Sequence, residues 1–380
     1  MVRMMTIVLL AAFAMPLAAG DWAPVVPGYE WSFPADHWSH PSFKTEWWYF
    51  TGHLAGEGDP QQRFGYQFTF FRVGLLPQTP ALDSSWATSC LIMGHASITD
   101  VSHGTHLFSE VLWRDTPLFG GFGAYPDPLI ASCLGPSGTA ARWSLSAEGD
   151  GFRIRMADRG QGMALDLLVT PQKQMVFQGP GGLSRKGRDP GAASYYFSYT
   201  RLETAGTIAA DGEDLAVTGT SWMDREFFSS ELTGEQTGWD WFSIQFEDGR
   251  ELMLYQLRHR DGTAAFGRGT WVSAAGEPVY LGMEQDWEMR VTDRWKSPET
   301  GISYPAGWIL ELDDPAGAQP LRLAITPLAP DQENVSRRSG LAYWEGAVTV
   351  RPAGAPADAP PLGRGYVELT GYGEGNRPPV

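Results

Sequence analysis

The stretch FKTEWWYFTGHL, residues 43–54, alternates large side chains around a single acid. On a β-strand, Glu46 and Trp48 would face one side, and Trp47 and Tyr49 would face the other. This period of two predicts a strand of an antiparallel sheet rather than a helix. Two interpretations of Glu46 stay open: it lies at the rim of an ordinary barrel core, or it faces an apolar pocket and works there.

The same series of landmarks occurs twice along the chain, in the same order. Four landmarks correspond, and the first consists of two segments: EWWYFTGHL and GYQFTFFR with DWFSIQF and ELMLYQLR, VTPQKQ with ITPLAP, ASYYFSYTRL with LAYWEGAVTV, and LAVTGTSW with VELTGYGE. Repeats of this length are domains rather than solenoid units. We predict an N-terminal domain over residues 21–229 and a C-terminal domain over residues 230–380. Each is long enough for an antiparallel barrel of about eight strands, which can hold one small ligand.

Composition supports an all-β protein. The chain has 45 Gly, 28 Pro, 16 Trp, 19 Phe and 13 Tyr, and we find no convincing long amphipathic helix. The net charge of −16 argues against nucleic acid or an anionic membrane surface as a partner. We expect a monomer.

The N-terminus has the layout of a secretory signal peptide. One arginine precedes an apolar run, and small residues follow near residue 20. We therefore expect cleavage there and a periplasmic or secreted protein, with an uncleaved membrane anchor as the alternative. In such a compartment Cys90 and Cys133 either pair or remain two buried thiols, and the sequence favours neither.

Several segments together resemble a known family. They are HPSFKTEWWYFTGHL, GHASITDV, QGPGGLSRKG, ASYYFSYTRL, GTSWMDREFFSS, GWDWFSIQFEDGRELMLYQLR, WKSPETGISYPAGW and AYWEGAVTV. They resemble the AttH-like family of paired lipocalin-like (calycin) proteins, which is related to carotenoid 1,2-hydratase. The resemblance runs from Phe33 to Tyr372 and implies two consecutive lipocalin-like antiparallel β-barrels. It implies a hydratase-like reaction much less specifically, because fold alone does not give chemistry.

Motifs for several other chemistries are absent from the sequence. No G-x-S-x-G occurs, so the "secreted hydrolase" label that the family often carries has no nucleophile-elbow support. Two H-x-x-H pairs, His37/His40 and His103/His106, lack companion ligands, and we interpret them as solvated loop histidines rather than a metal site. Neither a metal nor an organic cofactor is expected. The glycine-rich GPGGLSRKG is interpreted as a polar turn near a pocket mouth, with anion binding as the alternative.

Carboxylates among aromatic rings give the strongest chemical signal. Asp224 and Glu226 lie on one strand parity with Trp222, and Glu46 and Asp240 begin corresponding segments of the two repeats. Burial against indole rings raises the pKa of a carboxyl group, so that it can act as an acid. The ring faces would stabilise a developing cation. Hydration of an isolated alkene needs this combination.

The four acids are not equivalent. Glu46 and Asp240 occur in both copies, so we favour buried ion pairs with arginine for them. Asp224 and Glu226 have no clear counterpart in the second copy, whose ELTGYGE offers only Glu374. Asp224 is therefore the first candidate for the acid. In the hydratase-like relatives this segment commonly reads Asp-His-x-Trp, and here arginine follows the aspartate, which would lower the pKa of a neighbouring acid.

Three function hypotheses follow. The first is acid-catalysed hydration or isomerisation of a polyene, terpenoid or lipid, in the first barrel or at the junction between barrels. Asp224 would be the proton donor, assisted by Glu226 or His95. The predicted ligand-contacting residues are Glu46, Trp47, Trp48, Tyr49, Tyr196, Trp239, Asp240, Trp241, Tyr255 and Gln256. The second is a carrier of an apolar compound that works with an envelope ABC transporter. The third is a scaffold whose barrels are filled by their own side chains.

Overall fold

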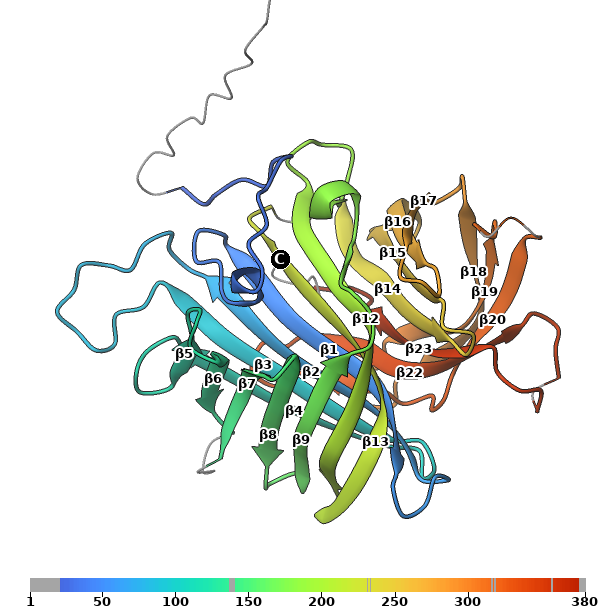
Figure 1. The fold of residues 1–380 in the computed structure, drawn as a ribbon, viewed down its shortest axis with the longest axis horizontal. Coiled ribbons are helices and arrows are strands. Elements are labelled where there is room, and N and C mark those ends of the chain that lie inside the picture. The colour runs from blue at the N-terminus through green and yellow to red at the C-terminus, as the bar shows by residue number, and fades with distance from the viewer. Residues whose placement is uncertain are drawn as a thin grey trace, which may run out of the picture.

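The computed structural model describes residues 21–136, 141–230, 232, 234–315, 317, 319–356 and 358–375. The predicted signal peptide, residues 1–20, lies outside the described residues. The described chain is all β, with two large antiparallel sheets that each curl into a near-closed barrel (Figure 1). The helical segments within the described ranges are the short 3-10 turns η1 (Ala35–His37) and η2 (Pro180–Gly182). The predicted pair of lipocalin-like barrels is therefore confirmed.

The first sheet is built from the N-terminal part of the chain, up to Phe228. Its strands are β1 (Thr45–Gly56), β2 (Arg63–Gly74), β3 (Cys90–Asp100), β4 (Thr105–Arg114), β5 (Gly120–Phe122), β6 (Leu129–Leu134), β7 (Arg142–Glu148), β8 (Gly151–Asp158), β9 (Met163–Pro171), β10 (Val176–Phe177), β11 (Leu183–Arg185), β12 (Ala193–Ala210) and β13 (Glu213–Phe228). They follow the order β4-β3-β2-β1-β13-β12-β9-β8-β7-β6-β5, and β10 and β11 pair with β12. The first and last landmark strands, β1 and β13, are thus neighbours.

The second sheet starts at Gln236 and repeats the plan with fewer strands. Its strands are β14 (Gln236–Phe246), β15 (Glu251–His259), β16 (Ala264–Val272), β17 (Pro278–Gly282), β18 (Trp287–Lys296), β19 (Ser303–Leu312), β20 (Leu321–Pro327), β21 (Glu333–Val335), β22 (Ala342–Pro352) and β23 (Gly363–Leu369). They follow the order β17-β16-β15-β14-β23-β22-β20-β19-β18, and β21 pairs with β22. Here β14 and β23 are the neighbours that correspond to β1 and β13.

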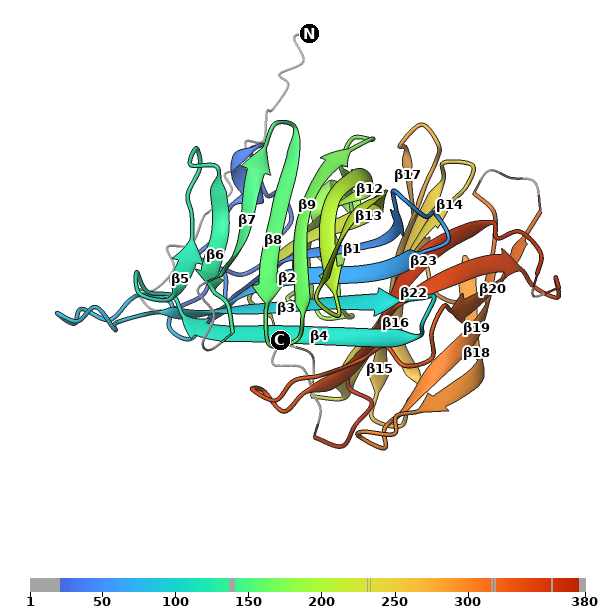
Figure 2. The ribbon, with the colours of Figure 1, turned by 90° about the horizontal axis from the view of Figure 1, so that it is seen from below.

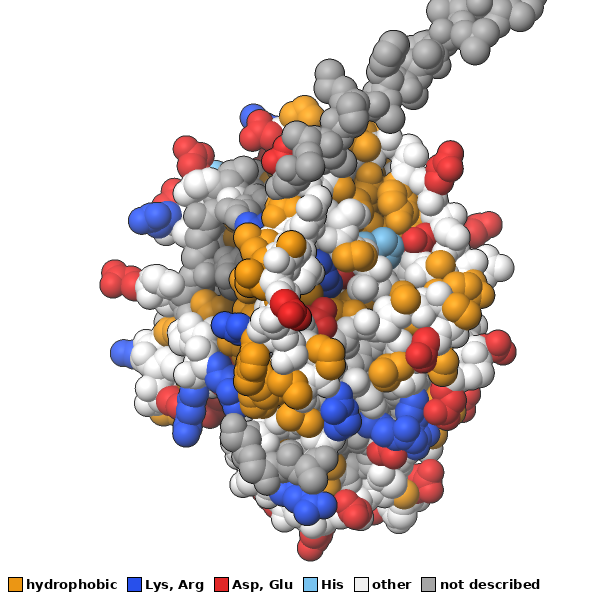
Figure 3. All heavy atoms as spheres, turned by 90° about the vertical axis from the view of Figure 1, so that its left-hand side faces the viewer, with side chains coloured by type: hydrophobic (Ala, Val, Ile, Leu, Met, Phe, Trp, Pro, Cys, Tyr) orange, Lys and Arg blue, Asp and Glu red, His pale blue; other side chains and the backbone are white. Residues whose placement is uncertain are grey.

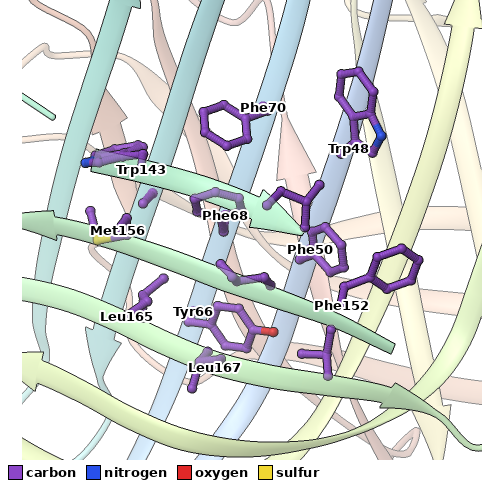
Figure 4. Packing of buried hydrophobic residues seen from close by; sticks show 14 of the residues in the cluster. Trp48, Phe50, Tyr66, Phe68, Phe70, Trp143, Phe152, Met156, Leu165 and Leu167 are labelled. Atoms are coloured by element: carbon purple, nitrogen blue, oxygen red, sulfur yellow. The ribbon is translucent and has the colours of Figure 1, made fainter. Parts of the chain in front are cut away.

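Aromatic side chains fill the first barrel. Trp48 and Phe50 of β1 point inward, together with Phe68 and Phe70 of β2, and Trp143 of β7 faces them (Figure 4). All five are fully buried. Their alternation along each strand is the pattern seen in the sequence, because successive side chains point to opposite faces. The first barrel interior is therefore a packed core.

The outer face of β1 and β2 is also buried, because the second sheet covers it. Strands β22 and β23 cross behind β1 and β2, as Figure 2 shows, and contact them. A Cβ added to Gly65 of β2 would lie only 2.8 Å from the Cβ of Ala347 on β22. Glycine therefore permits close approach of the two domains here. The burial of both faces explains why β1 is apolar on both parities.

Exposed hydrophobic side chains gather beyond the strands of the first barrel. In the connection between β2 and β3, Leu75, Leu76, Leu82 and Trp86 are each between 45% and 66% exposed. Figure 3 shows hydrophobic side chains clustered on that side of the molecule. Over the described residues, no helix has the length and apolar character that a membrane crossing requires.

Candidate functional site

A pocket lies at the junction between the two domains. Its cavity volume is about 160 Å³, which is room for about five water molecules or a ring-sized guest. Both domains contribute to the wall. The lining residues are Thr45, Trp47, Tyr49, Phe71, Val73, Met93, His95, Lys186, Tyr196, Asp224, Glu226, Phe228, Ser230, Leu232, Trp239, Trp241, Tyr255, Leu257, Leu341, Ala342, Tyr343, Glu368, Thr370 and Gly371. Of the two predicted locations, the structure places the pocket at the junction.

Strand register brings the acids of β13 to the pocket. Tyr49 of β1 lies opposite Asp224, and Trp47 lies opposite Glu226. These side chains share the outer face of the first sheet, whereas Trp48 and Arg225 point into the barrel. Strand parity groups these side chains by face, and the structure assigns the face of Trp47 and Tyr49 to the pocket, whereas the sequence placed predicted ligand contacts on both faces.

Asp224 is a buried acid held by three donors. Its carboxyl group accepts hydrogen bonds from the Tyr196 hydroxyl at 2.6 Å, the Trp222 indole at 2.7 Å and the Ser198 hydroxyl. Burial raises the pKa of Asp224 from 3.8 to about 7, and the charge of Glu226 adds to this rise, while the three hydrogen bonds oppose it. Near neutral pH, Asp224 therefore exchanges between a proton donor and a proton acceptor.

Glu226 is held by a cation from the glycine-rich turn. The Lys186 ammonium lies 2.6 Å from Oε1 of Glu226, and the Ser194 hydroxyl also donates to that carboxylate. Burial alone would lower the pKa of Lys186, but the charges of Glu226 and Asp224 outweigh it, so the pKa is raised. The Lys186 ammonium also lies 4.4 Å from the ring centre of Tyr255. The turn that the sequence predicts at a pocket mouth thus supplies a pocket cation.

Glu368 is a pocket acid that the sequence interpretation missed. It lies on β23 opposite Trp241, as Glu226 lies opposite Trp47 in the first copy, an equivalence that the strand register shows and the sequence repeat does not. Trp239 donates its indole N–H to Glu368 at 2.9 Å. Burial raises the pKa of Glu368 from 4.5 to about 7; the charges of the two β13 acids add to the rise, and the Trp239 hydrogen bond opposes it. The inference that the second copy offers only Glu374 is wrong.

His95 is a neutral polar group in the wall. Burial lowers its pKa from 6.5 to about 4. Its Nδ1 lies 2.7 Å from the Tyr343 hydroxyl, and its Nε2 has no hydrogen-bond partner among the described residues. His95 can therefore hold a ligand or a water molecule, but it is a poor proton donor at neutral pH.

Aromatic rings from both domains form the remaining wall. The ring centres of Tyr49 and Trp241 are 5.2 Å apart, nearly perpendicular, and the Trp241 indole donates to the Tyr196 hydroxyl at 3.1 Å. The Tyr255 hydroxyl lies 3.2 Å from that of Ser184, which joins the glycine-rich segment to the second domain. The pocket therefore presents π faces and two protonatable acids to one apolar space.

The structure does not bring Glu46 and Trp48 to the pocket. Glu46 is fully buried in an ion pair with Arg225, and Arg72 lies 3.7 Å away. Burial alone would raise the pKa of Glu46, but the charge of Arg225, with smaller effects of His40 and Arg72, outweighs burial and lowers the pKa from 4.5 to about 2. The Arg225 guanidinium lies 4.0 Å from the Trp48 ring centre. The prediction that Glu46 and Trp48 contact a ligand is therefore corrected.

Asp240 and Gln256 also lie outside the pocket wall. Arg258 donates to Asp240 at 2.8 Å, Gln256 donates to it at 2.8 Å, and the Tyr372 hydroxyl donates at 2.9 Å. Both copies thus use their first acid in a buried ion pair, as the structural interpretation expects. We remove these two residues from the candidate ligand contacts.

Arg225 does not act on Asp224 as the sequence suggested. The two are adjacent in the chain, but a strand places them on opposite faces. Arg225 lowers the pKa of Glu46, and Asp224 keeps a raised pKa. Arg225 therefore acts in the barrel core rather than on the pocket acid.

The structure also locates the first histidine pair and the two cysteines in the interior of the protein. His37 and His40 are largely buried, with His37 Nε2 3.1 Å from the Tyr199 hydroxyl, so their interpretation as solvated residues is wrong. The described part of the chain contains no group of three or more His, Cys, Asp or Glu side chains arranged for a metal ion. Cys90 and Cys133 are free, buried thiols.

The fold and the junction pocket together define a double lipocalin-like barrel protein with an acidic, aromatic site between its domains. The chain belongs to the AttH-like family, whose model matches residues 24–372. A crystal structure of an AttH-assigned protein from Nitrosomonas europaea is similar, with a TM-score of 0.78 and 33% identity, over 92% of this chain and 100% of that one.

More distant structures share the architecture. Kievitone hydratase from Nectria haematococca matches with a TM-score of 0.63 and 13% identity, over 88% of this chain and 91% of that one. The structure of CghA matches with a TM-score of 0.51 and 13% identity, over 86% of this chain and 88% of that one. At these identities the likeness shows the fold alone. No curated protein matches the chain.

Proposed function

We propose that the junction pocket binds a flat, largely apolar molecule and catalyses its hydration or isomerisation, with Asp224 as the acid. The observation that carries the proposal is the environment of Asp224. It lines an aromatic cavity, it is only 2% exposed, and its pKa is raised to about 7, chiefly by burial. A carboxyl group poised near the working pH is suited to proton transfer.

The reaction uses the pocket's own groups and water. Asp224 in its acid form gives its proton to one carbon of a carbon–carbon double bond, and the neighbouring carbon becomes cationic. The faces of Tyr49 and Trp241 stabilise that cation. In hydration, a water oxygen bonds to the cation and the water gives up one proton to a pocket carboxylate. In isomerisation, an adjacent carbon of the cation instead gives a proton to the Asp224 carboxylate, and the double bond forms at the new position.

Isotope incorporation tests the proposal whichever product is formed. The protein is purified after export from the producing cells, and its bound compound is extracted and identified by mass spectrometry. That compound is then incubated with the protein in deuterated water that contains heavy oxygen. Hydration incorporates deuterium and heavy oxygen, whereas isomerisation incorporates deuterium alone. Asp224→Asn should lower incorporation by about a hundredfold or more, and Asp248→Asn, on an exposed turn, should leave it unchanged. Equal incorporation by Asp224→Asn and wild type would refute the role of Asp224.

Carriage of an apolar compound to an envelope transporter is the second candidate. It is favoured by the apolar wall of the pocket, in which residues such as Phe71, Met93 and Leu257 outnumber polar groups. In that case the bound compound survives purification and acquires neither isotope. The same experiment therefore separates carriage from catalysis.

A further inference from the structure

A second pair of carboxyl groups lies directly behind the pocket. Glu368 of β23 lines the cavity, and Glu345 of β22 lies opposite it in the strand register. Opposed residues of an antiparallel pair project from the same face, about 5 Å apart at Cβ. Glu345 is only 1% exposed. Two carboxylates this close and this dry cannot both hold a full charge, so the pair keeps a proton between them.

The surroundings of this pair contain buried polar atoms that lack a hydrogen bond of regular geometry. Oε1 of Glu345 makes none within the described residues, although Asn334 donates to Oε2 at 3.2 Å. The hydroxyl groups of Tyr49 and Tyr366 also lack a hydrogen bond of regular geometry. The same holds for three atoms of the facing sheet, namely Ser97 Oγ, Gln67 Oε1 and His95 Nε2.

These atoms belong to the two sheet faces that meet at the junction. Tyr49 projects from the outer face of β1, and Tyr366 lies two residues before Glu368 on β23. Tyr49 lies within hydrogen-bonding reach of Glu345, and Ser97 within reach of Tyr366; each contact opposes the rise in pKa that burial causes in its partner. Side chains of the two sheets thus meet directly in this polar layer. Buried polar groups are almost always satisfied by protein or by ordered water, and a buried water typically needs two to four polar partners. The layer is therefore suited to hold ordered water next to the carboxyl pair.

We propose that Glu368 is the base that complements Asp224, and that protonated Glu345 and ordered water behind it stabilise the Glu368 carboxylate by hydrogen bonds. This inference rests on the proposed function, because it assigns the second half of the same reaction. Asp224 gives a proton to substrate carbon, the attacking water bonds to the cationic carbon, and the released water proton goes to the Glu368 carboxylate. The proton then returns through pocket water to the Asp224 carboxylate, so that one water molecule is added and both acids are restored.

Other titratable groups face the pair and bear on its proton affinity. They are Asp224 and Glu226 from β13, Lys186 after β11, Tyr49 from β1, His95 from β3, Tyr343 from β22, Tyr366 from β23 and Tyr255 from β15. Burial and the charge of Glu368 raise the pKa of Glu345 well above its ordinary value. The Lys186 ammonium is paired with Glu226. It therefore does not neutralise Glu345 or Glu368, and these two carboxyl groups share a proton with each other.

Infrared titration of the ligand-free protein tests the pair without a substrate. The carboxylic-acid carbonyl band is followed against pH in wild type, Glu368→Gln, Glu345→Gln and the control Glu374→Gln, which lies on an exposed part of the same segment. Glu368→Gln should remove a band that titrates near neutral pH. Glu345→Gln should move the Glu368 titration upward by about one pH unit or more, about tenfold in proton affinity, because the shared proton that stabilises the Glu368 carboxylate is lost. An unmoved titration in Glu345→Gln would overturn the shared proton. A crystal structure at atomic resolution should show water on Oε1 of Glu345, and a dry layer would overturn the water site.

The isotope assay separates the two proposals. If wild type incorporates deuterium and Glu368→Gln does so at the same rate, the base assignment falls and the proposed function stands. If wild type incorporates nothing, the proposed function falls, while the infrared titration still decides whether the carboxyl pair exists. Glu368→Asp keeps the carboxyl group and should restore part of the rate, which distinguishes lost chemistry from lost folding.

Discussion

Replacement of Glu46 by glutamine should destabilise the protein strongly at neutral pH. The change removes one charge from a fully buried ion pair and leaves Arg225, itself fully buried, without its counter-ion. The lowering of the Glu46 pKa from 4.5 to about 2 corresponds to about 3 kcal/mol, at about 1.4 kcal/mol per pKa unit. Breaking a buried pair by removing one partner costs about 3–5 kcal/mol, which agrees in size.

The pH dependence of this effect has a definite sign. The folded-state pKa is lowered, so the stabilisation is present above pH 4.5 and is lost as the pH falls towards about 2. Urea unfolding followed by tryptophan fluorescence, at several pH values between 7 and 3, measures the difference between wild type and Glu46→Gln. We expect about 3 kcal/mol at pH 7 and a steadily smaller difference below about pH 4.

An exposed ion pair provides the control. Glu311 pairs with Arg322 at 2.9 Å, but the two side chains are 58% and 57% exposed. Glu311→Gln should therefore cost less than about 1 kcal/mol at any pH in this range. A loss below about 1 kcal/mol for Glu46→Gln at pH 7, or one that does not shrink in acid, would refute the assignment of Glu46 as an architectural anion.

Three further outcomes are expected. Turnover should be greatest near pH 7 and fall above it, because Asp224 loses the proton that it must donate, and a rate that keeps increasing well above pH 7 would contradict the acid role. Burial raises the pKa of the Cys90 and Cys133 thiols to about 12, so both should resist alkylation in the native protein. Both should react once the protein is unfolded without reductant. If no thiol reacts in denaturant, the two cysteines form a disulfide. Gly65→Ala should destabilise the protein by about 1–3 kcal/mol, because the new Cβ would lie 2.8 Å from that of Ala347 across the domain junction. Urea unfolding measures this change, and an unchanged midpoint would show that the domains are not packed closely there.

Much of the candidate site could be predicted from residue types and strand parity. Nine of the predicted residues line the pocket: Trp47, Tyr49, His95, Tyr196, Asp224, Glu226, Trp239, Trp241 and Tyr255. The choice of Asp224 over the acids retained in both repeats also agrees with the buried ion pairs. Glu368 was missed because only the partner strand shows that its position repeats that of Glu226.

The sequence by itself determined the fold, because period-two alternation and a twice-used order of landmarks leave few architectures other than paired antiparallel barrels. It also determined which side chains share a face, since that depends on strand geometry alone. Only the tertiary structure decided which face is core and which is pocket, because both faces of residues 45–56 are apolar and buried. It also decided the charge state of each acid. The pKa of a carboxyl group depends on groups brought near it from distant strands, as Arg225 is brought to Glu46, and strand parity in the sequence does not specify those distances.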